Sequence, residues 1–282
     1  MITCPKCNTE LTDLFCKHCS ISYAVNDKII SFISNTENNL DDYKPEGLDK
    51  LYNYEKINFW FKNRMKLIRT VFKKFIKKNS HILEVGAGTG YVAENLINAG
   101  FTDYSIGELH LNGLLYAQKR GLTNLYQFDL YDPPFNDEFD VVAMFDVIEH
   151  IENDGKIIQN IGTILKSKGK LVLTVPAHMF LWSKIDDISG HKKRYNIKTI
   201  SDLLKQNGFK VRYITHFNLT ILPFLMIRSF LSKNDYKESN SGLKISTISN
   251  TLFNILCTID RIFLKLFKLP AGGSIIAVAE KG

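Results

Sequence analysis

The chain has 282 residues, of which 45% are hydrophobic and 23% charged, and its formal net charge is +7. Such a chain can bury one large core beside a small appendage. No basic stretch followed by an apolar core stands at its start, and no apolar run reaches the ~18 residues of a membrane span. This argues against a secreted precursor or an integral membrane protein and predicts a cytoplasmic location. The positive charge permits an anionic partner, such as nucleic acid, a phosphate-bearing substrate or a membrane surface, but does not require one.

Four of the five cysteines form two Cys-x-x-Cys pairs separated by eight residues: Cys4, Cys7, Cys16 and Cys19. Thiolates two residues apart on a tight turn can reach one tetrahedral zinc ion, and two such turns complete the site. Disulfides are the alternative, but a reducing cytosol and this spacing favour metal. Because all four ligands would be cysteines, the zinc would leave no open position and would be structural. Residues 1–33 are therefore predicted to form a compact zinc ribbon.

The next segments predict how this ribbon joins the rest of the chain. Residues 21–33 alternate in polarity around Asn26-Asp27, which indicates a hairpin that completes the ribbon. A stretch rich in Asn, Asp and Glu follows, so we place a linker at residues 34–54 and the main domain at 55–282. Residues 55–78 have helical spacing and many basic side chains. Such a helix can face a membrane or nucleic acid, but more often it packs on a domain and leaves a solvated face.

A short apolar strand followed by a glycine-rich turn lies at residues 81–90. Gly86, Gly88 and Gly90 stand at alternate positions, and a helix is predicted to begin near Tyr91. Glycine lets the backbone bend sharply and approach a ligand closely, and the free N–H groups of the helix favour anionic groups. The dinucleotide fingerprint would need glycine at position 91. Such turns also occur without a ligand, but this one indicates a nucleotide-type cofactor.

Acidic side chains follow the next three predicted strands. Glu108 lies close to the ~20-residue offset at which an acidic side chain binds a ribose in nucleotide-binding folds. Asp129 and Asp146 follow strands at residues 125–128 and 139–145. A carboxylate can accept hydrogen bonds from two vicinal hydroxyls at once. One such carboxylate is usually a solvated turn residue, whereas three in this order indicate a binding site.

Glu84 and the three glycines resemble the Glu/Asp-x-Gly-x-Gly-x-Gly motif of class I S-adenosylmethionine-dependent methyltransferases. The segment Asp146-Val147-Ile148-Glu149-His150 is similar to one found in the quinone-biosynthesis type of this family. The resemblance implies an α/β fold with a Rossmann-like, seven-stranded, mostly parallel sheet, helices on both faces, and S-adenosylmethionine as cofactor. It implies that these residues bind the cofactor: Glu84, Gly86, Ala87, Gly88, Gly90, Glu108, Leu109, Asp129, Leu130, Phe145 and Asp146.

Two further segments resemble one bacterial subgroup of the same family. Phe59-Trp60-Phe61-Lys62-Asn63-Arg64 is similar to its Phe-Trp-Phe-x-x-Arg segment, which covers the cofactor pocket and implies that role for Trp60 and Arg64. After a strand at residues 169–175, the chain follows the subgroup's Val-Pro-x-His-x-x-Leu-Trp-Ser-x-x-Asp and His-x-x-Arg-Tyr patterns. Lys193 replaces a second arginine.

That second segment supplies most of the substrate-side candidates, because it leaves the carboxyl end of a parallel strand, where open α/β sheets bind ligands. Imidazole titrates near neutrality, so a histidine could act as a base, and Asp186 could orient it. Arg194 could hold an anionic substrate. Any single member is as often merely hydrogen-bonded or solvated. The predicted catalytic residues are His150, His178, Asp186, His191, Arg194 and Tyr195.

The segment Asp132-Pro133-Pro134-Phe135 is similar to the tetrapeptide with which amino-methyltransferases hold a planar nitrogen. In those enzymes the tetrapeptide follows the fourth strand, whereas here it precedes that strand. We therefore interpret it as a proline-rigid loop.

The last predicted elements are a helix at residues 197–207 and an edge pair of strands at 209–217 and 274–279. An insert at about 218–273 separates the two strands and is far longer than a hairpin loop. It contains an apolar stretch at 221–231 and an amphipathic helix at 252–269. This helix fits core packing or a dimer contact, and it also fits peripheral contact with a lipid surface.

We therefore predict a methyltransferase that acts on an oxygen or nitrogen of a small molecule such as a sugar, a quinone or a lipid-linked metabolite. One alternative is an RNA methyltransferase that uses the zinc ribbon to recognise RNA. Another is a scaffold protein whose cofactor fold has lost activity.

Overall fold

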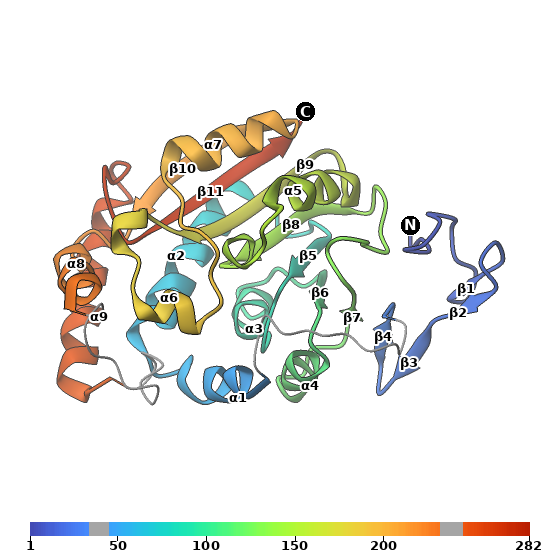
Figure 1. Ribbon diagram of the computed structural model, residues 1–282, viewed down its shortest axis with the longest axis horizontal. Coiled ribbons are helices and arrows are strands. Elements are labelled where there is room, and N and C mark those ends of the chain that lie inside the picture. The colour runs from blue at the N-terminus through green and yellow to red at the C-terminus, as the bar shows by residue number, and fades with distance from the viewer. Residues whose placement is uncertain (34–44, 232–244) are drawn as a thin grey trace.

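The computed structural model describes residues 1–33, 45–231 and 245–282. One large sheet crosses the molecule with helices on both faces, and the cysteine-rich N-terminus lies at one end of it (Figure 1). A separate two-stranded sheet pairs β1 (Phe15–Cys16) with β2 (Ile21–Ser22). The predicted α/β class and the helices on both faces are confirmed.

The large sheet contains nine strands in the order β10-β11-β9-β8-β5-β6-β7-β4-β3. Strands from β9 to β4 run parallel, whereas β11 is antiparallel to β9 and β10, and β3 to β4. Seven of the nine reproduce the predicted mostly parallel sheet. Their bounds are β3 Ala24–Asn26, β4 Ile29–Ser31, β5 Ile82–Val85, β6 Tyr104–Glu108, β7 Leu125–Gln127, β8 Phe139–Phe145, β9 Leu165–Pro176, β10 Phe209–Phe217 and β11 Ser274–Lys281.

Alternate side chains of the strands bury two separate apolar cores, because successive residues of a strand point to opposite faces. Val141 and Ala143 face α2, α3 and α4, whereas Val142 and Met144 face α5 and α7. The helices are α1 Pro45–Tyr54, α2 Phe59–Phe75, α3 Tyr91–Ile97, α4 Leu111–Lys119, α5 Asp154–Ile164, α6 Lys184–Ile188, α7 Ile197–Gln206, α8 Leu222–Leu231 and α9 Thr247–Phe263, with 3-10 turns η1 Ile148–His150 and η2 Met179–Leu181.

The strand order reverses at β5, which lies between β6 and β8. Val85 is paired with Gly107 on one side and with Met144 on the other. All three strands are parallel, so the chain leaves them at the same edge of the sheet. The glycine turn, Glu108 and Asp146 therefore lie together at the point where open α/β sheets bind ligands.

Residues 24–31 form a hairpin, but it does not complete the ribbon as predicted. β4 pairs in parallel with β7, with Ile30 opposite Tyr126. Ile29 is buried in the core of the main domain. The turn lies at Asp27-Lys28, both with positive φ, one residue later than expected. The apolar side chains of this hairpin extend the large sheet, so the separate ribbon is smaller than the predicted residues 1–33.

The predicted linker at 34–54 is wrong in its second part, because residues 45–54 form α1. Residues 34–44 lie outside the described part of the chain. Proline, glycine and polar side chains suggested a linker, but Leu48, Leu51 and Tyr52 recur at helical spacing. Tyr52 stacks on Tyr116 of α4, with ring centroids 4.5 Å apart. α1 therefore belongs to the main domain.

The N-terminus docks on the loop before β8. The Thr3 N–H donates to the Pro134 carbonyl at 2.8 Å, and Ile2 bridges to Phe135. Phe135 is buried and packs edge to face on Phe128, with centroids 5.6 Å apart. The Asp-Pro-Pro-Phe segment is a loop between β7 and β8, as predicted, and the structure shows in addition that the N-terminus docks on it.

Two helices form the insert between β10 and β11. α8 matches the predicted apolar stretch within one residue, whereas α9 begins and ends earlier than the predicted 252–269. Ser246 caps α9 by accepting from the Ser249 N–H. Beyond the helix, the Leu269 N–H donates to Thr215 Oγ1 at 2.9 Å, which returns the chain to the sheet. Residues 232–244 lie outside the described part of the chain.

Candidate active site

A cavity of about 1130 Å³ opens at the carboxyl ends of the central parallel strands. Small-molecule pockets usually enclose about 300–1,000 Å³, so this one has room for a cofactor and a second molecule. Every predicted cofactor residue except Gly90 contributes to its wall. Four of the predicted catalytic residues also line it, and these are His150, Asp186, His191 and Arg194.

The glycines of the turn after β5 have different roles. Gly86 has a φ of +62°, and a Cβ added there would lie 2.7 Å from Val147 Cγ2. A side chain at this position would therefore be strained and would clash. Gly90 caps α3 with a φ of +74°, and a Cβ there would meet Leu122 and Ala117. Gly90 thus allows close packing inside the domain and does not line the cavity, contrary to the prediction.

Two of the predicted carboxylates are held by local backbone groups. Glu108 is 7% exposed; its Oε2 accepts from the Gly88 N–H at 2.7 Å and its Oε1 from the His110 N–H at 3.0 Å. Asp129 is exposed at the rim, and its Oδ1 accepts from the Tyr131 N–H at 2.8 Å. Both line the same cavity. Glu108 in particular is a fixed acceptor for hydroxyl groups of a ligand.

Glu84 forms part of the wall beneath the glycine turn. It is 2% exposed, and its Oε2 accepts from the Tyr104 hydroxyl at 2.7 Å. Burial raises the pKa of Glu84 to about 8, although the Tyr104 hydrogen bond and the charge of Arg64 lower it. The carboxyl group is therefore mostly protonated at neutral pH.

Asp146 ends β8 and connects this strand to α2. Its φ is +58°, which is uncommon for a residue with a side chain. Its N–H donates to the Thr174 carbonyl at 3.0 Å, and its Oδ1 accepts from the Thr174 hydroxyl at 2.9 Å. The other carboxylate oxygen forms an ion pair with Arg64. Arg64 and Trp60 both line the cavity, so α2 forms part of its wall.

α1 is a part of the site that the sequence analysis missed. Leu48 and Leu51 line the cavity beside the glycine turn. Glu55, just after the helix, is buried, accepts from the Thr89 hydroxyl at 2.6 Å and pairs with Arg120. These bonds hold the end of α1 against the glycine turn and the end of α4. The signal was present as helical spacing of Leu48, Leu51 and Glu55, but the polar residues between them indicated a linker.

A second polar group lies beyond Asp146, and it includes Glu149, which the prediction omitted. Glu149 is fully buried, and neither of its carboxylate oxygens accepts a hydrogen bond from the described residues. Ligand atoms of Glu149, His150 and His191 lie within 4.8 Å of one another, close enough to hold a divalent cation or a ligand hydroxyl. Burial and the nearby Asp146 raise the pKa of Glu149, whereas burial and His191 lower that of His150 to about 4.

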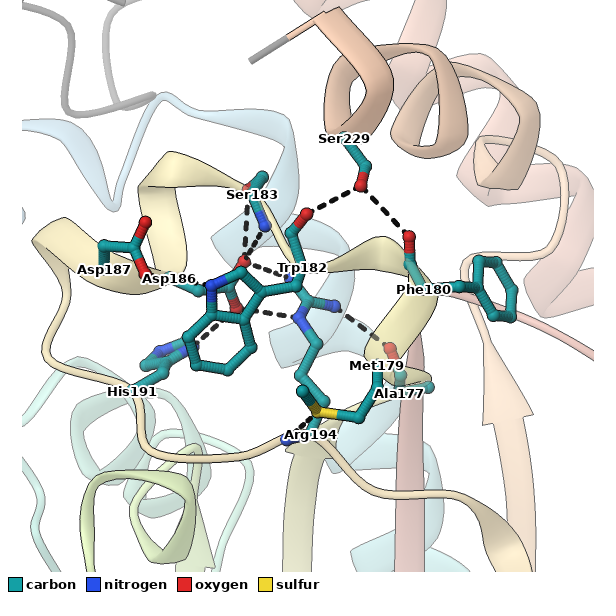
Figure 2. A network of polar contacts seen from close by, with 10 residues as sticks. All are labelled: Ala177, Met179, Phe180, Trp182, Ser183, Asp186, Asp187, His191, Arg194 and Ser229. Carbon is teal, nitrogen blue, oxygen red and sulfur yellow. Dashed lines mark hydrogen bonds and ion pairs between the residues drawn. The ribbon is translucent and has the colours of Figure 1, made fainter. Parts of the chain in front are cut away.

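Asp186 holds the histidine and the arginine of the following loop (Figure 2). Its Oδ1 accepts from His191 Nδ1 at 2.8 Å and from Arg194 Nε at 2.7 Å, and its Oδ2 accepts from the Ser183 N–H at 2.8 Å. Burial alone would raise the pKa of Asp186, but the bonds from His191 and Arg194 lower it well below its usual range. An ionised carboxylate can only accept, so Nδ1 of His191 carries the proton of this hydrogen bond, and in the neutral form of the ring Nε2 is the acceptor.

Two predicted catalytic residues do not line the cavity. His178 stacks on Phe180 and His216, with ring centroids 5.0 and 5.1 Å apart. Tyr195 is 4% exposed, and its hydroxyl donates to Asp154 Oδ2 at 2.8 Å. The structure therefore brings neither ring to the cavity: Tyr195 is buried in the protein, and the half-buried His178 ring lies against Phe180 and His216. Tyr195 instead ties the loop to the start of α5.

The four N-terminal cysteines come together although they lie on separate turns. Their sulfur atoms are within 4.8 Å of one another, and Cys7 Sγ lies 3.5 Å from Cys16 Sγ. No disulfide joins the cysteines in the described residues. Cys4 and Cys16 are fully buried. The four sulfur atoms are therefore close enough together to bind one metal ion.

The cavity wall fits the cofactor that the sequence resemblance implies. Glu108 offers a buried carboxylate to vicinal hydroxyls, and Asp129 offers another at the rim. Gly86 has no side chain, so a ligand can approach its backbone closely. These groups match the ribose, the amino groups and the close backbone approach that an adenosyl ligand needs. When bound, S-adenosylmethionine supplies a methyl group on an electrophilic sulfonium.

Comparison with known proteins identifies the family. A family model described as a methyltransferase domain matches residues 52–214, which is more than half of the chain. The ubiquinone biosynthesis O-methyltransferase of Rickettsia prowazekii is 30% identical over 217 residues, which cover 68% of this chain and 85% of that protein.

Solved structures show the same fold at lower identity. An S-adenosylmethionine-dependent methyltransferase from Archaeoglobus fulgidus has a TM-score of 0.51 at 18% identity and covers 77% of this chain and 94% of that one. The [4+2]-cyclase SpnF also has a TM-score of 0.51, at 14% identity, and covers 77% of this chain and 81% of that one. The fold alone therefore does not decide the activity. The family match does, since it includes the glycine turn, Glu108 and Asp146, and the chain belongs to the methyltransferase domain family as an S-adenosylmethionine-dependent methyltransferase.

Proposed function

We propose that this methyltransferase modifies a hydroxyl oxygen of a small aromatic molecule of the quinol or catechol type. The observation that carries the proposal is the Asp186–His191 pair beside the buried Glu149. The similar protein from Rickettsia prowazekii is named as an O-methyltransferase of ubiquinone biosynthesis, which supports an oxygen acceptor on a quinone-type ring.

His191 is suited to act as the base. A hydroxyl becomes a good nucleophile when its proton is removed, and Nε2 of His191 is the acceptor that remains once Nδ1 donates to Asp186. The ionised Asp186 stabilises the imidazolium that forms. A positioned base of this kind adds about 10²–10⁴-fold to the rate.

Glu149 favours an acceptor with two adjacent hydroxyls. Its carboxyl oxygens have no partner among the described residues and lie next to His191. A vicinal diol can donate one hydroxyl to His191 and the other to Glu149, which satisfies a buried group that is otherwise costly. Leu181 and Leu225 supply apolar wall for the ring or an attached tail.

The test is transfer of a labelled methyl group to an alkyl-substituted catechol, compared with the matching phenol and aromatic diamine. The catechol is expected to be the best acceptor, and His191→Gln should lower kcat about 100-fold or more. His81→Gln is the matched control, because His81 lies outside the cavity, and its rate should not change. Preference for the diamine, or activity only with added RNA, would reject the proposal. A rate that rises with added Mg²⁺ would assign Glu149, His150 and His191 to a cation instead.

We also propose that the cysteine cluster binds one structural zinc ion. Zinc–sulfur bonds of about 2.3 Å place the sulfurs of a tetrahedral site roughly 3.8 Å apart, close to the 3.5 Å between Cys7 and Cys16. Metal analysis should find one zinc per chain in the wild type and in Cys257→Ser, and none in the double variant Cys4→Ser/Cys7→Ser. Retention of zinc in the double variant would contradict the assignment.

A further inference from the structure

The insert helix α9 turns several polar side chains inward, beside Phe253, Leu256 and Cys257, and exposes a row of apolar side chains on its outer face. Ile248 is 84% exposed, Ile255 56% and Ile262 55%. A helix on the surface of a water-soluble domain normally shows the opposite arrangement, with its apolar stripe toward the core. The outer face of α9 is therefore more compatible with an apolar environment than with water.

Hydrogen bonds fix this orientation of α9. Asn250 Oδ1 accepts from the Phe59 N–H at 2.7 Å, and Asn254 Oδ1 accepts from Asn63 Nδ2 at 2.9 Å. On the same inner side, Asp260 is 2% exposed and accepts from the N–H of residue 220 at 3.1 Å. Rotating the helix to bury its isoleucines would break these hydrogen bonds. The backbone and side-chain groups that form them would then lose their partners, which costs free energy. The outward apolar stripe is thus built into the packing.

The neighbouring helix α8 shows the same inversion. Ser229 is buried, and its hydroxyl lies 3.0 Å from the Phe180 carbonyl oxygen and 2.6 Å from that of Trp182 (Figure 2). Phe230 and Leu231, by contrast, are 77% and 63% exposed.

α8 and α9 lie at the end of the molecule opposite the cysteine region (Figure 1), and both expose apolar side chains there. The two helices touch through Phe224 and Phe253, whose ring centroids are 5.2 Å apart. A continuous exposed apolar surface marks an interaction site, whereas single exposed residues do not. We call it the insert face, and it consists of Ile227, Phe230, Leu231, Ile248, Leu252, Ile255, Ile259, Ile262 and Leu266.

Basic side chains accompany the insert face. Lys66 and Arg69 are exposed on α2, which packs against α9, and Lys265 and Lys268 follow α9. The described residues 217–231 and 245–273 contain one acidic side chain, the buried Asp260. Burial and the nearby charges of Arg261, Lys62 and Arg69 lower the pKa of Lys66. An anionic surface would complement them.

The insert face also adjoins the cavity. Leu225 and Arg228 of α8 contribute to the cavity wall, while the next residues of the helix belong to the insert face. A molecule that enters from this side therefore passes apolar side chains before it reaches Glu149 and His191.

We propose that the insert face lies on the surface of a membrane containing anionic lipids. In the part of the chain that the structure describes, no helix is long and apolar enough to cross a bilayer, so the contact would be interfacial. The basic residues would meet lipid headgroups, and the apolar stripe would enter the boundary of the acyl chains. A second copy of the chain is a poorer occupant, because it would bring the same positive charges to the contact.

If the proposed O-methylation is right, this arrangement selects acceptors that carry a lipid tail. The tail would stay among the lipids and the ring would reach the cavity past α8. This last step rests on the proposed function, whereas the membrane contact does not.

Vesicle co-sedimentation tests the contact with the full chain. Vesicles of phosphatidylcholine mixed with phosphatidylglycerol should pellet the wild type, and vesicles of phosphatidylcholine alone should pellet less. Ile255→Glu should bind the mixed vesicles about tenfold more weakly or worse, because it places a charge in the apolar stripe. Val25→Glu is the matched control, since Val25 is 55% exposed but lies on β3 at the other end of the sheet.

Equal pelleting of Ile255→Glu and the wild type would overturn the proposal. So would a wild type that does not pellet and elutes as a dimer that Ile255→Glu dissociates, which would assign the insert face to a second copy. Melting temperatures check that both variants fold. Methylation of a water-soluble catechol without vesicles should be unchanged in Ile255→Glu, so loss of vesicle binding and failure of the proposed chemistry give different results.

Discussion

Replacing Glu84 by glutamine should remove a pH dependence from the stability of this protein. Glu84 is fully buried in β5 and has a pKa of about 8, against roughly 4.3 in an unfolded chain. The folded state therefore binds this proton more tightly than the unfolded state does. Its contribution to stability is fully present below about pH 4.3 and is lost as the pH rises toward 8. Glutamine has the same shape and never ionises.

The size of the effect follows from the two pKa values. Each unit between the unfolded pKa and the working pH costs about 1.36 kcal/mol while the folded carboxyl stays protonated. At pH 7 this amounts to roughly 3–4 kcal/mol relative to pH 4.3. The Tyr104 hydroxyl can donate to the glutamine oxygen as it donates to Glu84, so Glu84→Gln should keep this hydrogen bond.

Urea unfolding of the wild type and of Glu84→Gln at several pH values between 5 and about 8 measures the effect. The other titrating groups contribute equally to both proteins, so their contributions cancel in the difference between the two free energies of unfolding. Across this pH range, the free energy of unfolding of Glu84→Gln should rise by several kcal/mol relative to that of the wild type. The Tyr104 hydrogen bond lowers the pKa of Glu84. Tyr104→Phe should therefore raise that pKa, so that stability continues to fall to a higher pH than in the wild type. A difference that stays constant with pH would refute the reasoning.

Three other substitutions test the site. Glu108→Gln should weaken S-adenosylhomocysteine binding about tenfold or more in calorimetry, because it removes the charge from the acceptor for two hydroxyls; unchanged affinity would contradict the assignment. Asp186→Asn should lower kcat about 10²–10⁴-fold, and an unaltered rate would remove His191 as the base. Gly86→Ala should destabilise the protein by about 1–3 kcal/mol in urea, through its φ and the clash with Val147. Gly121→Ala, with a similar φ but open space around it, should cost less.

The sequence was sufficient for seven of the nine strands of the large sheet, because each of these strands carries its own pattern. β8 and β10 begin and end where apolar runs and flanking polar residues predicted. α1 and the hairpin at residues 24–31 were assigned wrongly for one reason. Their few apolar side chains are too sparse to show a domain core locally, and their partners, Tyr116 and Tyr126, are far along the chain. Only the tertiary contacts reveal that they belong to the main domain.

Prediction of the site divides along similar lines. Residues next to a strand end, such as Glu108 and Asp146, could be placed because parallel strands all end at one edge. His178 and Tyr195 could not, since they lie in a loop whose path decides which side chains face the cavity. Glu149 was overlooked because an acid in a short helical turn reads as solvated. Its complete burial is visible only in the structure.

The turn at Asp146 connects two parts of the cavity wall, one at the glycine turn and the other at Glu149 and His150. Its left-handed backbone turns the chain from β8 into η1, which brings Glu149 and His150 to the cavity wall. Its side chain holds Arg64 on the cofactor side, and Val147 packs against Gly86 of the glycine turn. A change in this one turn therefore shifts the walls of both subsites, because close-packed contacts transmit displacement rather than absorb it. The glycine turn is thus joined to η1 by the contact between Gly86 and Val147, the residue that directly precedes η1.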